Sequence, residues 1–204
     1  MNDVKFNKIV IFINSLVPLA LLVWDAARGN LGANPIEFFL RTTGVLTLVF
    51  LLVSLAITPL RKYTGWNNLI KFRRMIGLYA FFYGCLHFIT YIGFDRSLSF
   101  SNTVSDIVQR PFIAVGMAAF FLMIPLAVTS TNGMIKRLGG KNWQKLHRLS
   151  YPIAIGGVVH FYMIVKSDTT YPLLFGLILA GLLYYRFYAA NDKQKTTLAA
   201  NVKK

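Results

Sequence analysis

Long apolar runs alternate with short polar loops along the whole of this 204-residue chain. Six of the runs reach the ~17–25 residues that a helix needs to cross the hydrocarbon core of a bilayer. They lie at about residues 8–24, 42–60, 75–94, 111–129, 146–166 and 172–188. We expect the second run to end at Thr58-Pro59, because proline interrupts the interior of a helix. We expect the fourth run to begin at Pro111, because proline is favoured in the first turn of a helix. The pattern predicts an all-α integral membrane protein, a six-transmembrane-helix bundle that forms one domain over residues 1–204.

The composition favours a membrane protein and argues against a nucleic-acid partner. Hydrophobic residues make up 55% of the chain and charged residues 14%, whereas soluble globular domains carry about 25% charged residues. The net charge of +15 comes from basic residues in the short loops between apolar runs, which is the pattern of membrane topology. The one cysteine, Cys85, allows neither a disulfide within the chain nor the CxxCH sequence that attaches haem covalently.

The loop charges predict which side of the membrane each loop faces. Two loops, after the second and fourth runs, are basic and contain no acidic residue; their cations are Arg61, Lys62, Lys71, Arg73, Arg74, Lys136, Arg137, Lys141 and Lys145. The C-terminal tail adds Arg186, Lys193, Lys195, Lys203 and Lys204 against Asp192. Acidic and basic residues balance in the other loops. Since basic loops stay in the cytoplasm, both termini are predicted to be cytoplasmic, and the basic loops can also contact anionic membrane lipid.

Two of the three histidines reach the same depth in different runs. His87 lies thirteen residues after Arg74, and His160 lies fifteen after Lys145, so they stand roughly 20 and 22 Å from the basic end at ~1.5 Å per residue. An ionisable side chain inside a membrane span is costly, and by default it faces the bundle interior and marks a functional site. One imidazole from each of two helices at one level is what a bis-histidine haem b requires. The alternative is that each histidine only forms hydrogen bonds between helices.

The third histidine lies at the opposite, basic end of the fifth run. His147 is level with Arg73 and Arg74, which are most often topology determinants but can also pair with a haem propionate or a flavin phosphate. On one ideal helix His147 and His160 would stand about 140° apart at ~100° per residue, although Pro152 between them can bend the helix. His147 is therefore either an interfacial histidine or a contact to a second cofactor.

Several segments together resemble one protein family: KFRRMIGLYAFFYGCLHFITYIGFD (71–95), WQKLHRLSY (143–151) and HFYMIVKSD (160–168), with AITPLR before the third run. The resemblance is to the MsrQ family, formerly YedZ, the haem-binding membrane subunits of bacterial periplasmic methionine sulfoxide reductase systems. These belong to the ferric-reductase-like transmembrane superfamily, whose members carry a histidine pair on each of two helices. Here the fifth run has both histidines, His147 and His160. The third run has only His87, and at the depth of His147 it carries Arg73 and Arg74 instead of a histidine.

The resemblance implies two cofactors, haem b and FMN, although no phosphate-binding motif for FMN is visible. It also implies a place in the bacterial inner membrane, electrons from the quinone pool or a flavin reductase, and a periplasmic molybdopterin methionine sulfoxide reductase subunit, MsrP, as partner and acceptor. The chain would be a non-catalytic electron-transfer subunit. Its expected cofactor-binding residues are His87, His160, His147, Arg73 and Arg74, with His87 and His160 on the haem iron and His147 as a further candidate metal ligand.

Two other functions remain open from the residues alone. A stand-alone ferric or quinone-linked cytochrome b reductase would share the haem but not the sulfoxide reductase partner. A small transporter could use the histidines to carry protons or a divalent metal, and it would show no visible absorbance from haem.

Overall fold

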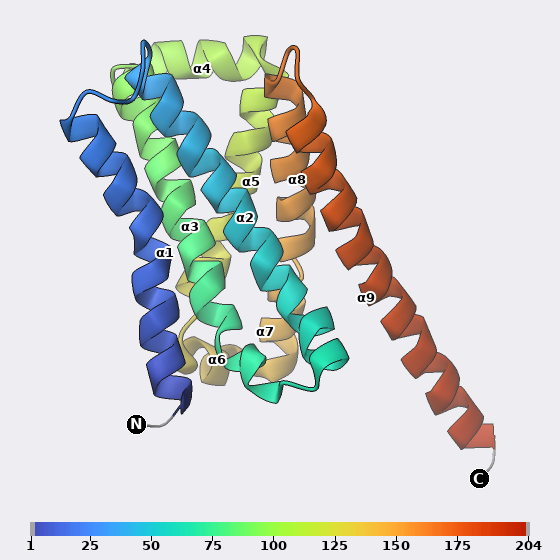
Figure 1. Ribbon diagram of the computed structural model, residues 1–204. Coiled ribbons are helices and arrows are strands. Elements are labelled where there is room, and N and C mark those ends of the chain that lie inside the picture. The colour runs from blue at the N-terminus through green and yellow to red at the C-terminus, as the bar shows by residue number, and fades with distance from the viewer. Residues whose placement is uncertain (1–2, 203–204) are drawn as a thin grey trace.

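The computed structural model describes residues 3–202, without the side chains of residue 190 and residues 192–202 (Figure 1). Within residues 3–202 every regular element is a helix. The α-helices are α1 (Asp3–Ala27), α2 (Pro35–Thr64), α3 (Arg73–Thr90), α4 (Phe100–Gln109), α5 (Pro111–Val128), α6 (Asn132–Leu138), α7 (Gly140–His147), α8 (Ser150–Ile164) and α9 (Thr170–Val202). A 3₁₀ helix, η1 (Asn67–Lys71), precedes α3, and a π-helix, η2 (Tyr91–Asp95), follows it. The all-α prediction is confirmed for this part of the chain.

The long helices lie side by side and share two distinct ends. Helices α1, α2, α3, α5, α8 and α9 run along the bundle, α4 lies across one end, and α6 and α7 lie at the other (Figure 1). We call these the α4 end and the α7 end. Helix α1 begins and α9 finishes on the side of the α7 end (Figure 1). The start of α1 and the end of α9 therefore lie on the same side of the bundle as the basic loops.

Five helices of the described residues are long and apolar enough to cross a membrane: Asp3–Ala27, Pro35–Thr64, Arg73–Asp95, Pro111–Val128 and Thr170–Ala189. They correspond to five of the six predicted spans. Only 11–33% of the residues in their most apolar windows are buried inside the structure. Many large apolar side chains, such as Leu21, Ile89 and Leu177, are instead exposed on the outside of the bundle. Such an apolar surface suits a bilayer, and the chain is a multi-pass membrane protein.

The predicted fifth span, residues 146–166, is not one helix. Helix α7 ends at His147, and α8 runs only from Ser150 to Ile164, 15 residues. The break has a physical cause in Pro152, which has no N–H to donate to the Arg148 carbonyl and whose ring would clash with it in a continuous helix. That carbonyl accepts the N–H of Tyr151 instead, at 3.0 Å. Helix α8 rises about 22 Å, less than the ~30 Å hydrocarbon core, so the prediction of a sixth full span is not confirmed.

The prediction that the second span ends at Thr58-Pro59 is wrong. Helix α2 continues through Pro59 to Thr64 and ends at Gly65, which adopts the left-handed conformation with φ of 72°. Pro59 leaves the carbonyl of Leu55, four residues earlier, without its helical donor. The side chain of Arg186 in α9 supplies a replacement at 2.9 Å. Because lipid offers no hydrogen bonds to backbone groups, this contact permits the proline inside the helix.

The last helix is longer than the predicted sixth span. Helix α9 begins at Thr170, near the predicted start, and continues beyond residue 188 to Val202. The residues expected to form a polar tail are therefore helical as far as residue 202. The side chains of Asp192, Lys193 and Lys195, and all of Lys203 and Lys204, lie outside the part of the chain that the structure describes.

One apolar cluster connects five of the helices. Its buried members come from α2, α3, α5, α8 and α9, and they are Leu48, Leu51, Leu52, Leu55, Ala80, Met123, Ile153, Ala154 and Leu179. Helix α1 contributes none of them and is attached mainly to α3. The hydroxyl groups of Tyr79 and Tyr83 donate to the carbonyls of Phe12 (2.9 Å) and Ser15 (2.6 Å) in α1. These bonds hold α1 against the bundle through polar groups that lipid cannot satisfy.

The buried Tyr83 bond should contribute measurably to stability. Replacing Tyr83 with Phe removes one buried hydrogen bond and changes little else, so the free energy of unfolding should fall by about 1 kcal/mol. The thermal unfolding midpoint in one detergent would report the change. The matched control is Tyr162→Phe, because Tyr162 is 50% exposed. Equal midpoints for the two variants would contradict the role of this bond.

Candidate functional site

The structure brings His87 of α3 and His160 of α8 together inside the bundle. Their ring centroids are 6.2 Å apart and their planes are nearly perpendicular, at 88°. His87 lies three residues before the end of α3, and His160 lies four before the end of α8. The pair is therefore close to the α4 end, at the common depth that the sequence predicts.

Each of these imidazoles is held through its Nδ1 atom. Nδ1 of His87 lies 2.9 Å from the carbonyl oxygen of Leu40 in α2. Nδ1 of His160 lies 2.6 Å from the carbonyl oxygen of Phe112 in α5. A carbonyl oxygen can only accept, so both Nδ1 atoms carry the proton, and both Nε2 atoms keep a free lone pair. A ring N–H bonded to a backbone carbonyl is the usual arrangement of a metal-ligating histidine.

Each ring also lies directly on a glycine of the neighbouring helix. A Cβ atom added at Gly44 would stand 3.1 Å from Nδ1 and Cε1 of His87. At Gly116 it would stand 2.6 Å from the same atoms of His160. Neither glycine stands out in the amino-acid sequence. Both rings occupy space that a side chain would otherwise fill.

The spacing of the two rings is compatible with one metal ion between them. With a metal–nitrogen distance of about 2 Å and a ring radius of roughly 1 Å, two trans imidazoles have centroids roughly 6 Å apart. The observed 6.2 Å fits this arrangement. Among the described residues no group of three or more His, Cys, Asp or Glu side chains could hold a metal ion.

Aromatic side chains line the space between α3 and α5 near the pair. The ring of Phe120 in α5 stacks on Phe88 of α3 at 4.6 Å, and on Phe81 at 5.9 Å. Phe88 directly follows His87. The neighbourhood of the two histidines is therefore apolar, which suits a flat, largely apolar cofactor.

His147 lies at the α7 end and does not share a site with His160. Its ring stacks on Trp143 with centroids 3.9 Å apart, and its Nε2 lies 3.1 Å from Oγ1 of Thr129. That hydroxyl donates to the carbonyl of Pro125 at 2.6 Å, so it accepts the proton of Nε2. Trp143 donates through Nε1 to the Thr129 carbonyl at 2.9 Å. These contacts fasten α7 to the end of α5 and leave the lone pair on Nδ1 of His147.

The two arginines singled out from the sequence have different surroundings. Arg74 is exposed, and its Nη1 donates to Oδ1 of Asn132 at 2.6 Å, which ties α3 to α6. Arg73 is half-buried and within electrostatic reach of His147 and Arg186. Arg73 therefore faces the cluster at the α7 end, whereas Arg74 serves a contact between helices.

Arg186 is a member of this cluster that sequence reasoning missed. It donates to the Tyr151 hydroxyl at 2.7 Å and to Thr58 Oγ1 at 3.4 Å, in addition to the Leu55 carbonyl, and its buried Nε has no hydrogen-bond partner. The sequence reasoning counted it among the charges of the tail. Its place inside the apolar segment LLYYRFYA was the signal, since a charged residue inside a span marks a functional site by default.

Ion pairs are confined to the α4 end in the described part of the chain. They join Glu37 with Arg41, Asp95 with Arg96, and Asp106 with Arg96 and Arg110. No such pair involves Arg73 or Arg186 among the described residues. The α7 end therefore holds two neighbouring guanidinium groups without a carboxylate partner, which can pair with an anionic group of a ligand.

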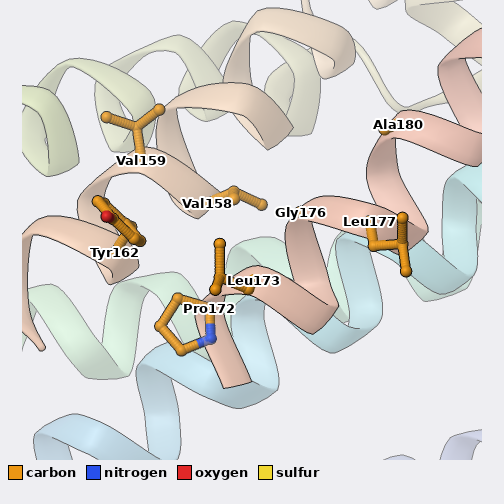
Figure 2. A pocket seen from close by; sticks show the side chains of 8 residues that line it. All are labelled: Val158, Val159, Tyr162, Pro172, Leu173, Gly176, Leu177 and Ala180. Atoms are coloured by element: carbon orange, nitrogen blue, oxygen red, sulfur yellow. The ribbon is translucent and has the colours of Figure 1, made fainter. Parts of the chain in front are cut away.

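A groove of about 600 Å³ lies between α8 and α9, on the outside of the bundle (Figure 2). It is lined by Val158, Val159, Tyr162, Pro172, Leu173, Gly176, Leu177 and Ala180. These side chains are apolar apart from the Tyr162 hydroxyl, and Figure 2 shows no titratable group among them other than this phenol. None of the five residues expected to bind cofactors lines the groove, which has the character of a lipid-facing surface.

Comparisons with known proteins agree with this arrangement. Residues 43–158 match the family of the ferric reductase like transmembrane component, which defines the chain as a membrane component of that type. The chain is 52% identical over 189 residues to the protein-methionine-sulfoxide reductase heme-binding subunit MsrQ of Herminiimonas arsenicoxydans, covering 92% of this chain and 87% of the relative. It is 49% identical over 195 residues to the protein of that name from Rhodospirillum rubrum, covering 94% and 92%. The chain belongs to the MsrQ family.

A third relative extends the same result. The MsrQ heme-binding subunit of Ralstonia nicotianae is 49% identical over 183 residues, covering 89% of this chain and 84% of the relative. The family match takes in His87 and His147 and ends two residues before His160. No solved structure matches the chain.

Proposed function

We propose that this chain is a haem b-binding electron-transfer subunit of a periplasmic protein-methionine-sulfoxide reductase system. The observation that carries the proposal is the pair of imidazoles 6.2 Å apart, each with Nδ1 bonded to a helix carbonyl. The names of the MsrQ relatives, heme-binding subunits of protein-methionine-sulfoxide reductase, support it. The haem would be bound non-covalently, since Cys85 alone cannot form the attachment sequence.

His87 and His160 would hold the iron through their Nε2 atoms. A haem b supplies reversible one-electron chemistry there, and two imidazoles leave no open position for oxygen or substrate. The chain itself would therefore carry electrons and not reduce sulfoxide. The metal-transporter alternative is less well supported, because the described residues offer no third side chain to complete a protein-only metal site.

The charges and the position of the pair favour electron transfer toward the periplasm. Under the positive-inside rule, the α7 end faces the cytoplasm and the α4 end the periplasm, in the bacterial inner membrane. His160 lies about 6 Å along α8 from the α4 end of that helix. A soluble molybdopterin subunit, MsrP, docked at the α4 end would come near the pair. The mixed charges of Asp95, Arg96 and Arg110 there would make docking only moderately sensitive to salt.

A second site at the α7 end would receive electrons from the quinone pool or a flavin reductase. His147, Arg73 and Arg186 surround it, and the two arginines favour an anionic group such as the phosphate of FMN or a haem propionate. FMN comes from the resemblance to the MsrQ family. The support from the structure is the pair of neighbouring guanidinium groups that no acid of the described residues neutralises.

Haem ligation is tested by replacing either ligand. The purified protein should show a low-spin, six-coordinate haem spectrum, and His87→Ala or His160→Ala should abolish it or reduce it severely, because each removes one axial ligand. His147→Ala is the matched control and should retain the spectrum. An unchanged low-spin spectrum in both ligand variants would rule the assignment out.

The direction of electron transfer is tested with the partner. The haem is reduced without oxygen, and the molybdopterin subunit is then added with a methionine sulfoxide substrate. Reoxidation should require both additions, and absorbance at the haem bands follows it. A haem that stays reduced in their presence would favour the stand-alone cytochrome b reductase.

The site at the α7 end is tested with neighbouring arginines. Arg73→Gln should lower the affinity for FMN about tenfold or more, because it removes a charge-assisted contact to the phosphate, and it should leave the haem spectrum unchanged. Arg74→Gln is the control, since Arg74 is exposed and bonded to Asn132. Flavin fluorescence after extraction measures the bound FMN. Equal flavin content in the two variants would remove Arg73 from the site.

A further inference from the structure

The surroundings of the two facing histidines repeat along the chain. Leu40 and Gly44 on α2 correspond to Phe112 and Gly116 on α5, 72 residues later. The two histidines are 73 residues apart. Each is followed directly by a phenylalanine, and an aspartate lies eight positions after it. His87, Phe88 and Asp95 thus correspond to His160, Phe161 and Asp168. The pair α2–α3 and the pair α5–α8 thus present one arrangement twice.

The repeated element is a glycine four residues after the carbonyl that holds the ring. In an α-helix the carbonyl of residue i accepts the N–H of residue i+4 and keeps a second lone pair. The side chain of residue i+4 lies beside that oxygen. Thr43 illustrates this, because its Oγ1 donates to the carbonyl of Phe39 at 2.7 Å. A glycine at i+4 leaves the oxygen open to a ring from another helix.

We infer that Gly44 and Gly116 are positioning residues for the two haem-ligating histidines. Their missing side chains let each ring approach the neighbouring helix closely enough for its Nδ1–H to bind the open carbonyl, which leaves Nε2 available to a metal. This inference rests on the proposed haem site and adds to it the residues that set the ring orientation. The two glycines do not touch the iron, so they act only through His87 and His160.

The contacts predict a graded effect of adding one methyl group. At Gly116 the new Cβ would stand 2.6 Å from Nδ1 and Cε1 of His160, a separation that real Cβ atoms do not reach, so the ring must move. At Gly44 the separation from His87 is 3.1 Å, and a shift of a few tenths of an ångström relieves it. Alanine should therefore disturb His160 more than His87. In both cases the ring loses alignment with the carbonyl that holds its Nδ1. Loss of such a supporting contact typically weakens metal binding about 10–100-fold, and we expect an effect of about this size here.

The experiment compares three alanine variants of the full-length protein, purified with haem. Gly116→Ala should convert much of the ferric haem from low-spin to high-spin and lower haem affinity roughly 10–100-fold, and added imidazole should restore the low-spin spectrum by filling the vacated position. Gly44→Ala should show a smaller shift in the same direction. Gly77→Ala is the control on α3, because its Cβ would only approach Ser54 Oγ at an ordinary 3.6 Å. Optical and electron paramagnetic resonance spectra report the spin state, and the thermal midpoint is measured separately.

The outcomes separate this inference from the function on which it depends. A wild-type protein without low-spin haem would overturn the proposed function itself. A wild-type low-spin haem that is unchanged in Gly116→Ala and Gly44→Ala would overturn the role of the glycines and leave the haem site standing. Should Gly116→Ala fail to fold, Gly44→Ala decides: a spin shift that imidazole reverses supports the inference, and a spectrum equal to that of Gly77→Ala overturns it.

Discussion

The hydrogen bond from an imidazole Nδ1 to a helix carbonyl is the interaction on which the arrangement of this bundle depends most. It fixes the tautomer of each histidine, so that both Nε2 atoms keep a free lone pair. It also links α3 to α2 and α8 to α5, the helices that carry the two halves of the site. The same bond satisfies a polar N–H that would be costly to leave unpaired in lipid. One contact thus serves packing and chemistry together.

The same need to satisfy polar groups explains the irregular helices. Pro59 deprives the Leu55 carbonyl of its donor, and Arg186 reaches across from α9 to replace it. Pro152 has no such replacement within a continuous helix, and the chain instead turns at Arg148 and begins α8 two residues later. Pro59 thus lies inside a helix whose freed carbonyl receives a donor from another helix, whereas at Pro152 the turn itself satisfies the freed carbonyl and two helices are separated.

The sequence predicts the spans well because the length of an apolar run is a direct property of the residues, and five of the six runs are long, apolar helices. The depth of His87 and His160 follows from counting residues along helices from the basic loops. The break before Pro152 does not follow in this way. Pro18, Pro59 and Pro125 all lie inside helices, so the presence of proline alone does not predict where a helix breaks.

The pairing of the two histidines was predictable from the sequence, and the residues that support their rings were not. Two histidines inside apolar runs stand out because charge and polarity are rare there. Gly44 and Gly116 do not stand out, since glycine is common in membrane helices and their role appears only when a ring from another helix lies on them. The 72-residue spacing of the two glycines is visible in the sequence. Its link to the histidines appears only in the structure, where α3 packs on α2 and α8 packs on α5.

Charge is distributed unevenly between the two ends of the bundle, and this bears on the proposed direction of electron flow. At the α4 end, Asp95 and Asp106 form ion pairs with Arg96 and Arg110, two acidic groups with two basic ones. At the α7 end, Arg73 and Arg186 have no acidic partner among the described residues. Under the proposed orientation, an anionic donor or cofactor is attracted to the cytoplasmic side by this local field. The periplasmic side presents paired charges, so a partner there would be selected by the complementarity of its surface rather than by net attraction.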